Sequence, residues 1–224
     1  MELLNSSFHY ETAFPVINAT NRGINYKFMA AEAAYILQGR NDVEYLGNVL
    51  PHFERYSDDG EYQAGAYGPP FLDQIPYVLD CLGKDETSRQ AVISIWRPRP
   101  YASRDIPCTL TMQFLIRKER LHTIVNMRSS DAYMGLIYDT FCFAMMSSVI
   151  AASMETNLGE TWINAGSSHL YERDWTNAAK LIQDPGNILG CNPWYPTFRQ
   201  DLIELLDGVK QEDKALEFLL NNET

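Results

Sequence analysis

The sequence predicts an α+β protein in which one mixed β-sheet is covered by helices. Three strand patterns follow one another between residues 91 and 127, long helical patterns lie on both sides of them, and no regular strand–helix–strand alternation links them. With 224 residues, 46% of them hydrophobic, the chain can bury a sizeable core as one domain. We therefore expect a single domain over residues 1–224.

The strands are predicted from alternation and from β-branched residues. Ala91 to Trp96 is β-branched and apolar, whereas Thr109 to Ile116 and Leu121 to Met127 alternate between apolar and polar side chains. The polar sequence RKER between the last two predicts a hairpin turn. A further strand is expected from Glu160 to Tyr171.

The helices are predicted from apolar residues at helical spacing, and residues 60–70, rich in Gly and Pro, are expected to form a loop. The most apolar helix carries Asp139 and several hydroxyl residues, so we expect it to be buried in the core rather than to span a membrane. The helical segments are Asn25–Gln38, Leu72–Leu82, Tyr133–Met154, Tyr171–Ile182 and the acidic, amphipathic Arg199–Asn221.

The net charge of −11 argues against a protein that binds duplex nucleic acid, but not against a nucleotide enzyme, which needs only a few local arginines. The four cysteines form no CxxC pair, and the histidines form no metal set. The start of the chain lacks the pattern of a signal peptide. We expect a reduced, cytoplasmic protein without a bound metal.

Cys108 and the Arg128-Ser129 pair are the first candidates for chemistry. Pro107 fixes the chain before Cys108, where a cysteine near arginines can act as a thiolate nucleophile. The alternative, commoner for a free cysteine, is a small buried hydrophobic residue. Arg128 and Ser129 at a helix entry form a natural phosphate clamp, or else Ser129 only caps the helix.

Two carboxylates interrupt apolar helices. Glu32 lies in MAAEAAYIL and Asp139 in LIYDTFCFAMM. Each either faces solvent, which is the commoner case, or is buried with a raised pKa and able to relay protons. His169 and Tyr171 alternate along a predicted strand and could share one face, the alternative being a histidine satisfied within the core.

The order of these segments resembles the thymidylate synthase superfamily over about residues 8–174. EAAYILQGRND is similar to the family's glutamate-containing helix, IPCTLTMQFLI to its nucleophile strand, and NMRSSDAYMGLIYD to its RSxDxxxGxxxN segment, the most specific match. AYGPPF resembles the VYG loop, TSRQAVISIWRP the SRR segment of the dimer interface, and GSSHLY the GDxHLY segment.

The resemblance implies a thymidylate synthase-like fold and a homodimer whose interface is a sheet face and whose active sites are shared across it. The implied substrates are a pyrimidine nucleoside 5′-monophosphate and 5,10-methylenetetrahydrofolate. Cys108 would attack C6 of the ring, while Glu32 and Tyr67 would organise water and protons. The residues implied to bind nucleotide are Arg128, Ser129, His169, Tyr171 and Arg89 of the partner subunit, and those implied to bind folate are Asp131 with Phe53 or Tyr56.

Asp139 is the most informative departure, because the family's synthases have Asn at this position. An amide pairs with uracil, whereas cytosine presents an acceptor at N3 and an amino donor at C4. A carboxyl suits cytosine, since it accepts from the amino group and, when protonated, donates to N3. Asp139 therefore indicates a cytosine nucleotide.

Thr109 and Met127 also depart from the synthases, which have His and Gln there, and CTLTMQFLIRKERLHTIVNMRSSD and SSFHYETAF resemble the phage deoxycytidylate hydroxymethylase branch. In that branch water rather than hydride adds to the methylene at C5, giving 5-hydroxymethyl-dCMP. The resemblance suggests a phage gene, and the host cytoplasm as the site of action. Gln90 and Ser7 replace two phosphate-binding arginines, a loss for which Arg22 could compensate.

Three other functions stay open. A ribose form of the enzyme would act on CMP, and a folate-dependent C5 methyltransferase would make 5-methyl-dCMP or dTMP by hydride transfer. A non-catalytic relative would bind a nucleotide or a replication partner. The acidic segment Asp201–Asn221 could dock such a partner, although a solvated helix is the commoner explanation.

Overall fold

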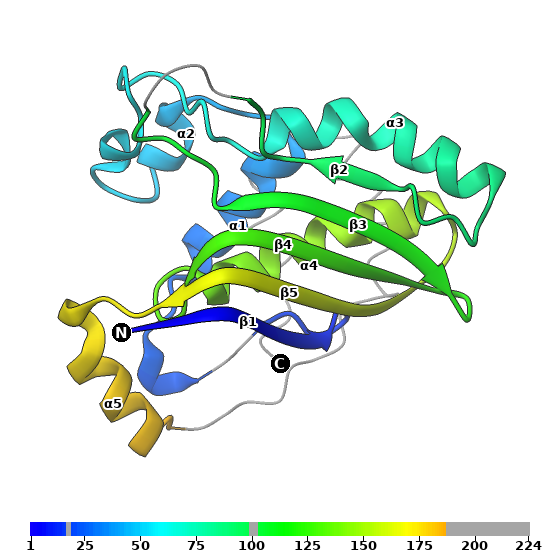
Figure 1. The fold of residues 1–224 in the computed structure, drawn as a ribbon. Coiled ribbons are helices and arrows are strands. Elements are labelled where there is room, and N and C mark those ends of the chain that lie inside the picture. The colour runs from blue at the N-terminus through cyan, green and yellow to red at the C-terminus, as the bar shows by residue number, and fades with distance from the viewer. Residues whose placement is uncertain (17–18, 99–102, 187–224) are drawn as a thin grey trace.

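A five-stranded mixed sheet forms the centre of the computed structural model, which describes residues 1–16, 19–98 and 103–186 (Figure 1). The strand order is β1-β5-β4-β3-β2, in which β4 and β5 run parallel and the other neighbours run antiparallel. The strands are β1 (Glu2–Glu11), β2 (Val92–Ser94), β3 (Thr109–Arg117), β4 (Arg120–Asp131) and β5 (Asn157–His169).

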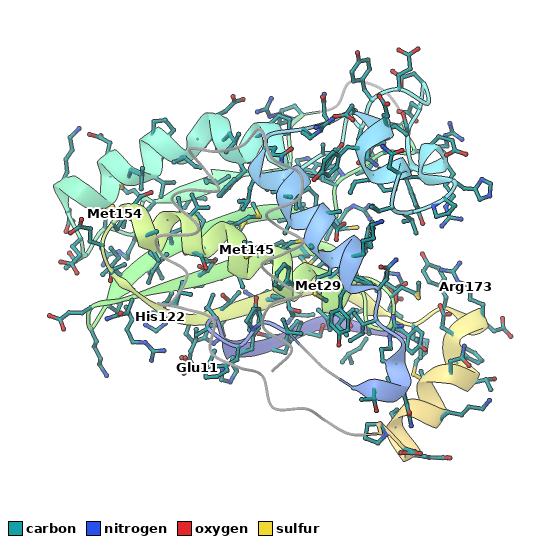
Figure 2. All side chains as sticks on the ribbon, turned by 180° about the vertical axis from the view of Figure 1, so that it is seen from behind. Glu11, Met29, His122, Met145, Met154 and Arg173 are labelled. Atoms are coloured by element: carbon teal, nitrogen blue, oxygen red, sulfur yellow. The ribbon has the colours of Figure 1, made fainter. Side chains whose placement is uncertain are left out.

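Helices cover one face of this sheet. In Figure 1 they lie behind the strands, and no described helix covers the face turned to the viewer. Helices α3 and α4 pack on the sheet and α1 packs on both of them; Figure 2 shows this side, with Met29 on α1 and Met145 on α4. The helices are α1 (Tyr26–Leu37), α2 (Val43–Gly47), α3 (Gly68–Lys84), α4 (Leu136–Ser153) and α5 (Trp175–Gln183).

The core lies between α4 and the covered face of the sheet. Alternate residues of β4, among them Leu121, Val125 and Met127, are buried there, as the period of a half-covered strand requires. Helix α4 is long and apolar enough to cross a membrane, but most of it is buried inside the fold. The predicted core helix is therefore confirmed.

The predicted α+β class and the predicted hairpin are also confirmed. Lys118 and Glu119 have φ values of 52° and 57°, which fit a two-residue turn that matches the twist of β3 and β4. Helix α3 begins at Gly68, four residues before the prediction, because prolines are well accommodated in a first helical turn. The expected loop over residues 60–70 is accordingly too long.

Other boundaries differ more. Strand β1 was not expected, although Ser6, Phe8 and Tyr10 alternate toward the covered face. Strand β5 begins at Asn157 rather than residue 160 and ends at His169. The segment β4–α4–β5 is a parallel crossover, although no strand–helix–strand unit was expected. The predicted helix over residues 199–221 lies outside the described residues.

Candidate active site

The start of β3 and the end of β4 bring Cys108 next to the Arg128-Ser129 pair. The backbone N–H of Arg128 donates to the carbonyl of Cys108 at 2.8 Å, and Oγ of Ser129 lies 3.7 Å from Sγ of Cys108. Cys108 is a free thiol and only partly buried. The antiparallel pairing of the two strands therefore holds an accessible thiol beside a hydroxyl.

The Arg128 side chain holds the loop that carries this thiol. Its Nε donates to the carbonyl of Pro107 and one Nη to that of Ile106, both at 3.0 Å, while the other Nη donates to Oγ of Ser129 at 3.0 Å. A guanidinium has five N–H donors, so donors remain for an anion, and the residue is exposed. Arg128 thus positions Cys108 and keeps a positive charge beside it.

Glu32 faces α4 rather than solvent. Sγ of Cys142 on α4 donates to Oε2 of Glu32 across 3.7 Å. Burial raises the pKa of Glu32 to about 7, against the lowering effect of the Cys142 hydrogen bond. The expectation of a solvent-facing carboxylate is therefore wrong. A carboxyl with this pKa can both give and take a proton at neutral pH.

Asp139 lies in the first turn of α4 and interacts electrostatically with the carboxyl group of Glu32. Burial, followed by the negative charges of Glu32 and Asp131, raises the pKa of Asp139 to about 8. The solvent-facing alternative is wrong here too. At neutral pH the side chain is mostly protonated, so it offers one O–H donor and one C=O acceptor.

Tyr67 is hydrogen-bonded to the strand that follows the thiol. Its hydroxyl accepts a hydrogen bond from the backbone N–H of Thr109, the residue after Cys108, at 3.2 Å. Burial raises the pKa of Tyr67, and the charges of Asp139 and Cys108 raise it further. The phenol therefore stays protonated and can donate a hydrogen bond inside the site.

Two helix ends meet beside Tyr67. A Cβ on Gly68 would lie 2.7 Å from the carbonyl oxygen of Ile36 and 2.9 Å from Cα of Gly39, so α1 and α3 pack backbone to backbone. Only glycine allows this approach. It fixes the position of Tyr67 relative to α1, the helix that carries Glu32.

We expected His169 and Tyr171 to alternate along one strand, but they do not. Strand β5 ends at His169, and Tyr171 precedes the 3-10 turn Glu172–Asp174. Their rings nevertheless meet edge to face with centroids 4.9 Å apart. His169 pairs with Asp131 of β4, so the two side chains lie at the same end of the sheet as Ser129.

Arg89 lies far from Cys108 within one chain. Its backbone carbonyl accepts a hydrogen bond from Nε2 of Gln113, five residues along β3 from Cys108, which is roughly 17 Å at strand spacing. Ser7 is exposed in the middle of β1. Arg22 donates to the carbonyl of Tyr133 at 2.6 Å and stacks on its ring.

The candidate folate residues differ in exposure. Oδ1 of Asp131 accepts from the backbone N–H groups of Tyr133 and Met134, at 3.0 and 2.9 Å, which leaves Oδ2 for another donor. Phe53 is 6% exposed and packs in the core, whereas Tyr56 is 45% exposed. Tyr56 is therefore the more accessible aromatic surface of the two.

Sequence reasoning missed Cys142 and gave Thr109 no role. Cys142 stands three residues after Asp139, which on a helix places both on one face, and this spacing was the available signal. Thr109 was noted only as a departure from the synthases. In the described part of the chain no group of His, Cys, Asp and Glu could hold a metal ion.

A family model described as thymidylate synthase matches residues 3–188. The chain belongs to the thymidylate synthase family. The family comprises one-carbon transferases that act on nucleoside monophosphates, typically as dimers, with 5,10-methylenetetrahydrofolate as the donor.

Three curated relatives refine this assignment. A deoxyuridylate hydroxymethyltransferase of Bacillus phage SP01 is 29% identical over 220 residues, 89% of this chain and 56% of the relative. A deoxyuridylate hydroxymethyltransferase of Pseudomonas phage M6 is 30% identical over 190 residues, which cover 80% of this chain and 53% of the relative. A thymidylate synthase of Francisella philomiragia is 25% identical over 187 residues, 73% and 67%. This family member thus spans about half the length of the two phage relatives.

Proposed function

We propose that the protein is a hydroxymethyltransferase that transfers a one-carbon unit to C5 of dCMP and adds water to give 5-hydroxymethyl-dCMP. The observation that carries the proposal is the partly buried carboxyl of Asp139, beside Glu32 and Asp131, whose pKa of about 8 keeps it mostly protonated. In this state it donates to N3 of cytosine and accepts from the amino group at C4. Names of the two phage relatives support hydroxymethyl transfer as the reaction type.

Each site residue of this chain has a separate role in the proposed reaction. Cys108 forms a bond with C6 of the ring, which makes C5 nucleophilic toward the one-carbon unit. Arg128 and Ser129 hold the 5′-phosphate with the remaining guanidinium donors and a hydroxyl. Glu32, with a pKa of about 7, takes and returns protons at the ring, and Tyr67 donates a hydrogen bond beside it.

The site also fits the family's folate. Oδ2 of Asp131 can accept from the N–H donors of a pterin, and the exposed ring of Tyr56 offers an apolar surface to it. His169 and Tyr171 lie at the same end of the sheet and are proposed to hold the sugar 3′-hydroxyl. When bound, the folate supplies a methylene group at the oxidation level of formaldehyde.

We also propose a homodimer with shared sites. One sheet face is covered by no described helix (Figure 1). It carries Trp162 between the rings of His9 and His122, with centroids at 5.9 and 5.6 Å, an aromatic surface suited to a second copy. Arg89, distant from Cys108 in its own chain, would then serve the partner's phosphate site. We expect the enzyme to act in the cytoplasm, the host's if a phage encodes it.

A second candidate is hydroxymethylation of dUMP. The two phage relatives are named for deoxyuridylate. Uracil would require the Asp139 proton on the other carboxyl oxygen, so that O–H faces O4 and C=O faces N3–H. CMP hydroxymethylation, or methylation to 5-methyl-dCMP or dTMP, would use the same nucleophile. The base, the sugar and the final step therefore need one experiment that separates them.

The test is one incubation with methylenetetrahydrofolate and equal amounts of dCMP, CMP and dUMP, read by product mass. We expect a gain of CH2O on dCMP, and the nucleotide that gains mass identifies both base and sugar. A gain of CH2 with dihydrofolate formation contradicts hydroxymethyl transfer. No release of tritium from labelled C5 contradicts any enzymatic role, because that release needs the nucleophile.

A further inference from the structure

Thr109, which follows Cys108, carries a buried hydroxyl that the proposed chemistry does not yet use. The residue is 0% exposed, and its Oγ1 has no hydrogen-bond partner in the described part of the chain. Buried hydroxyls in folded proteins are nearly always paired, with protein or with ordered water. Oγ1 therefore points to a small polar ligand inside the site.

The surroundings of this hydroxyl are those of Tyr67. The backbone N–H of Thr109 donates to the Tyr67 hydroxyl at 3.2 Å, and the Thr109 side chain is close enough to lower the pKa of that phenol. Since the Tyr67 oxygen accepts from the backbone, its own proton is directed to another acceptor. The charge of Asp139 acts on the same phenol.

Two hydroxyls with unused hydrogen-bonding capacity thus lie together, those of Thr109 and Tyr67. A buried water typically has two to four polar partners, and these groups supply that number. Thr109 is also the chain neighbour of Cys108, so the water would lie near the ring atoms bonded to Sγ.

We propose that Thr109, together with Tyr67, holds the water molecule that adds to the one-carbon unit on C5. This inference rests on the proposed hydroxymethyl transfer and makes Thr109 a positioning residue for its last step. The Thr109 hydroxyl would then favour water over other nucleophiles in the addition to the methylene carbon.

This step is an addition of water with loss of the bond to the enzyme. Before it, C6 is bonded to Sγ of Cys108 and C5 carries a double bond to the CH2 carbon. The water oxygen bonds to that CH2 carbon, and one water proton passes to the carboxylate of Glu32. The electron pair of the exocyclic double bond forms C5=C6, and the C6–S bond breaks with Cys108 leaving as thiolate. No oxidant or reductant is required.

The test compares Thr109→Val, which removes only the hydroxyl, with Thr109→Ser, which restores one. The matched control is Thr156→Val: Thr156 lies away from the site, and its Oγ1 donates to the carbonyl of Glu119 beside the β3–β4 turn. Each protein is given methylenetetrahydrofolate and dCMP labelled with tritium at C5. The readout is the ratio of CH2O product to tritium released, with 2-mercaptoethanol added in parallel to trap the methylene carbon as a thioether.

We expect this ratio to fall about tenfold or more in Thr109→Val, with thioether formed in its place, because water is no longer positioned. Thr109→Ser should recover to within about threefold of the wild-type ratio, and Thr156→Val should keep the wild-type ratio. If Thr109→Val does not fold, Thr109→Ala takes its place. A ratio unchanged in the variant lacking the hydroxyl, or product and tritium release falling in proportion, overturns the inference. If wild-type protein releases tritium without CH2O product, the proposed function fails instead.

Discussion

Oε2 of Glu32 accepts a hydrogen bond from Sγ of Cys142 across the contact between α1 and α4, at 3.7 Å. Burial, with the charges of Glu32 and Asp139, raises the pKa of Cys142, so the thiol stays protonated and acts as the donor. The hydrogen bond in turn lowers the pKa of Glu32, which burial has raised to about 7. Cys142 therefore keeps the proton relay close to neutrality.

Cys142→Ala should move the pH dependence of turnover. Without the thiol donor the pKa of Glu32 rises, so the acid limb of the kcat profile shifts to higher pH and activity at pH 7 falls about threefold. Cys142→Ser keeps a donor and should retain the wild-type limb. Identical pH profiles for the alanine variant and wild type would show that Cys142 does not tune Glu32.

Cys108→Ser should abolish tritium release from C5 by at least about 10³-fold, because serine is a far weaker nucleophile. Its melting temperature should stay within about 2 °C of wild type, since the side chains are similar in size. Cys81→Ser is the control: this partly buried cysteine contacts Oγ of Ser88 at 3.1 Å, outside the site. Residual activity in Cys108→Ser comparable to the control would refute the nucleophile assignment.

The stability of the fold should depend on pH through Asp139 and Glu32. Both pKa values are raised on folding, so the folded chain binds protons that the unfolded chain releases between about pH 4 and pH 8. The stability from these protons is present at low pH and is lost as pH rises through the folded pKa values.

Asp139→Asn removes one of these titrations. Its melting temperature should therefore exceed that of wild type by about 7–14 °C more at pH 8 than at pH 5. Asp80→Asn, at an exposed ion pair with Lys84, should show no such difference between the two pH values. Thermal unfolding by circular dichroism measures both, and a pH-independent difference for Asp139→Asn would contradict a protonated carboxyl in the fold.

Shared active sites predict complementation between two inactive variants. If Arg89 serves the partner's site, a hybrid dimer of Cys108→Ser and Arg89→Ala has one site with an intact thiol and an intact partner arginine. Equal mixing after unfolding and refolding should give about a quarter of the wild-type sites. A mixture as inactive as its two components would place Arg89 outside the shared site.

Local patterns predicted the core helix, the β3–β4 hairpin and the order of the site segments. They failed where tertiary contacts decide. Strand β1 has few buried residues and is held by its pairing with β5. The close approach of Gly68 on α3 to Ile36 on α1 is likewise a tertiary contact. The burial of Glu32 and Asp139 depends on how α1 packs on α4. The spacing of apolar residues within one helix carries no information about that packing.

The role of Asp139 is tested by the ratio of kcat/KM for dCMP to that for dUMP, measured in wild type and in Asp139→Asn. We expect wild type to favour dCMP and the amide, which pairs with uracil, to shift the ratio toward dUMP by about 10²-fold or more, because mispaired buried polar groups are costly. An unchanged ratio, with both proteins active, would contradict the reading of the base by Asp139.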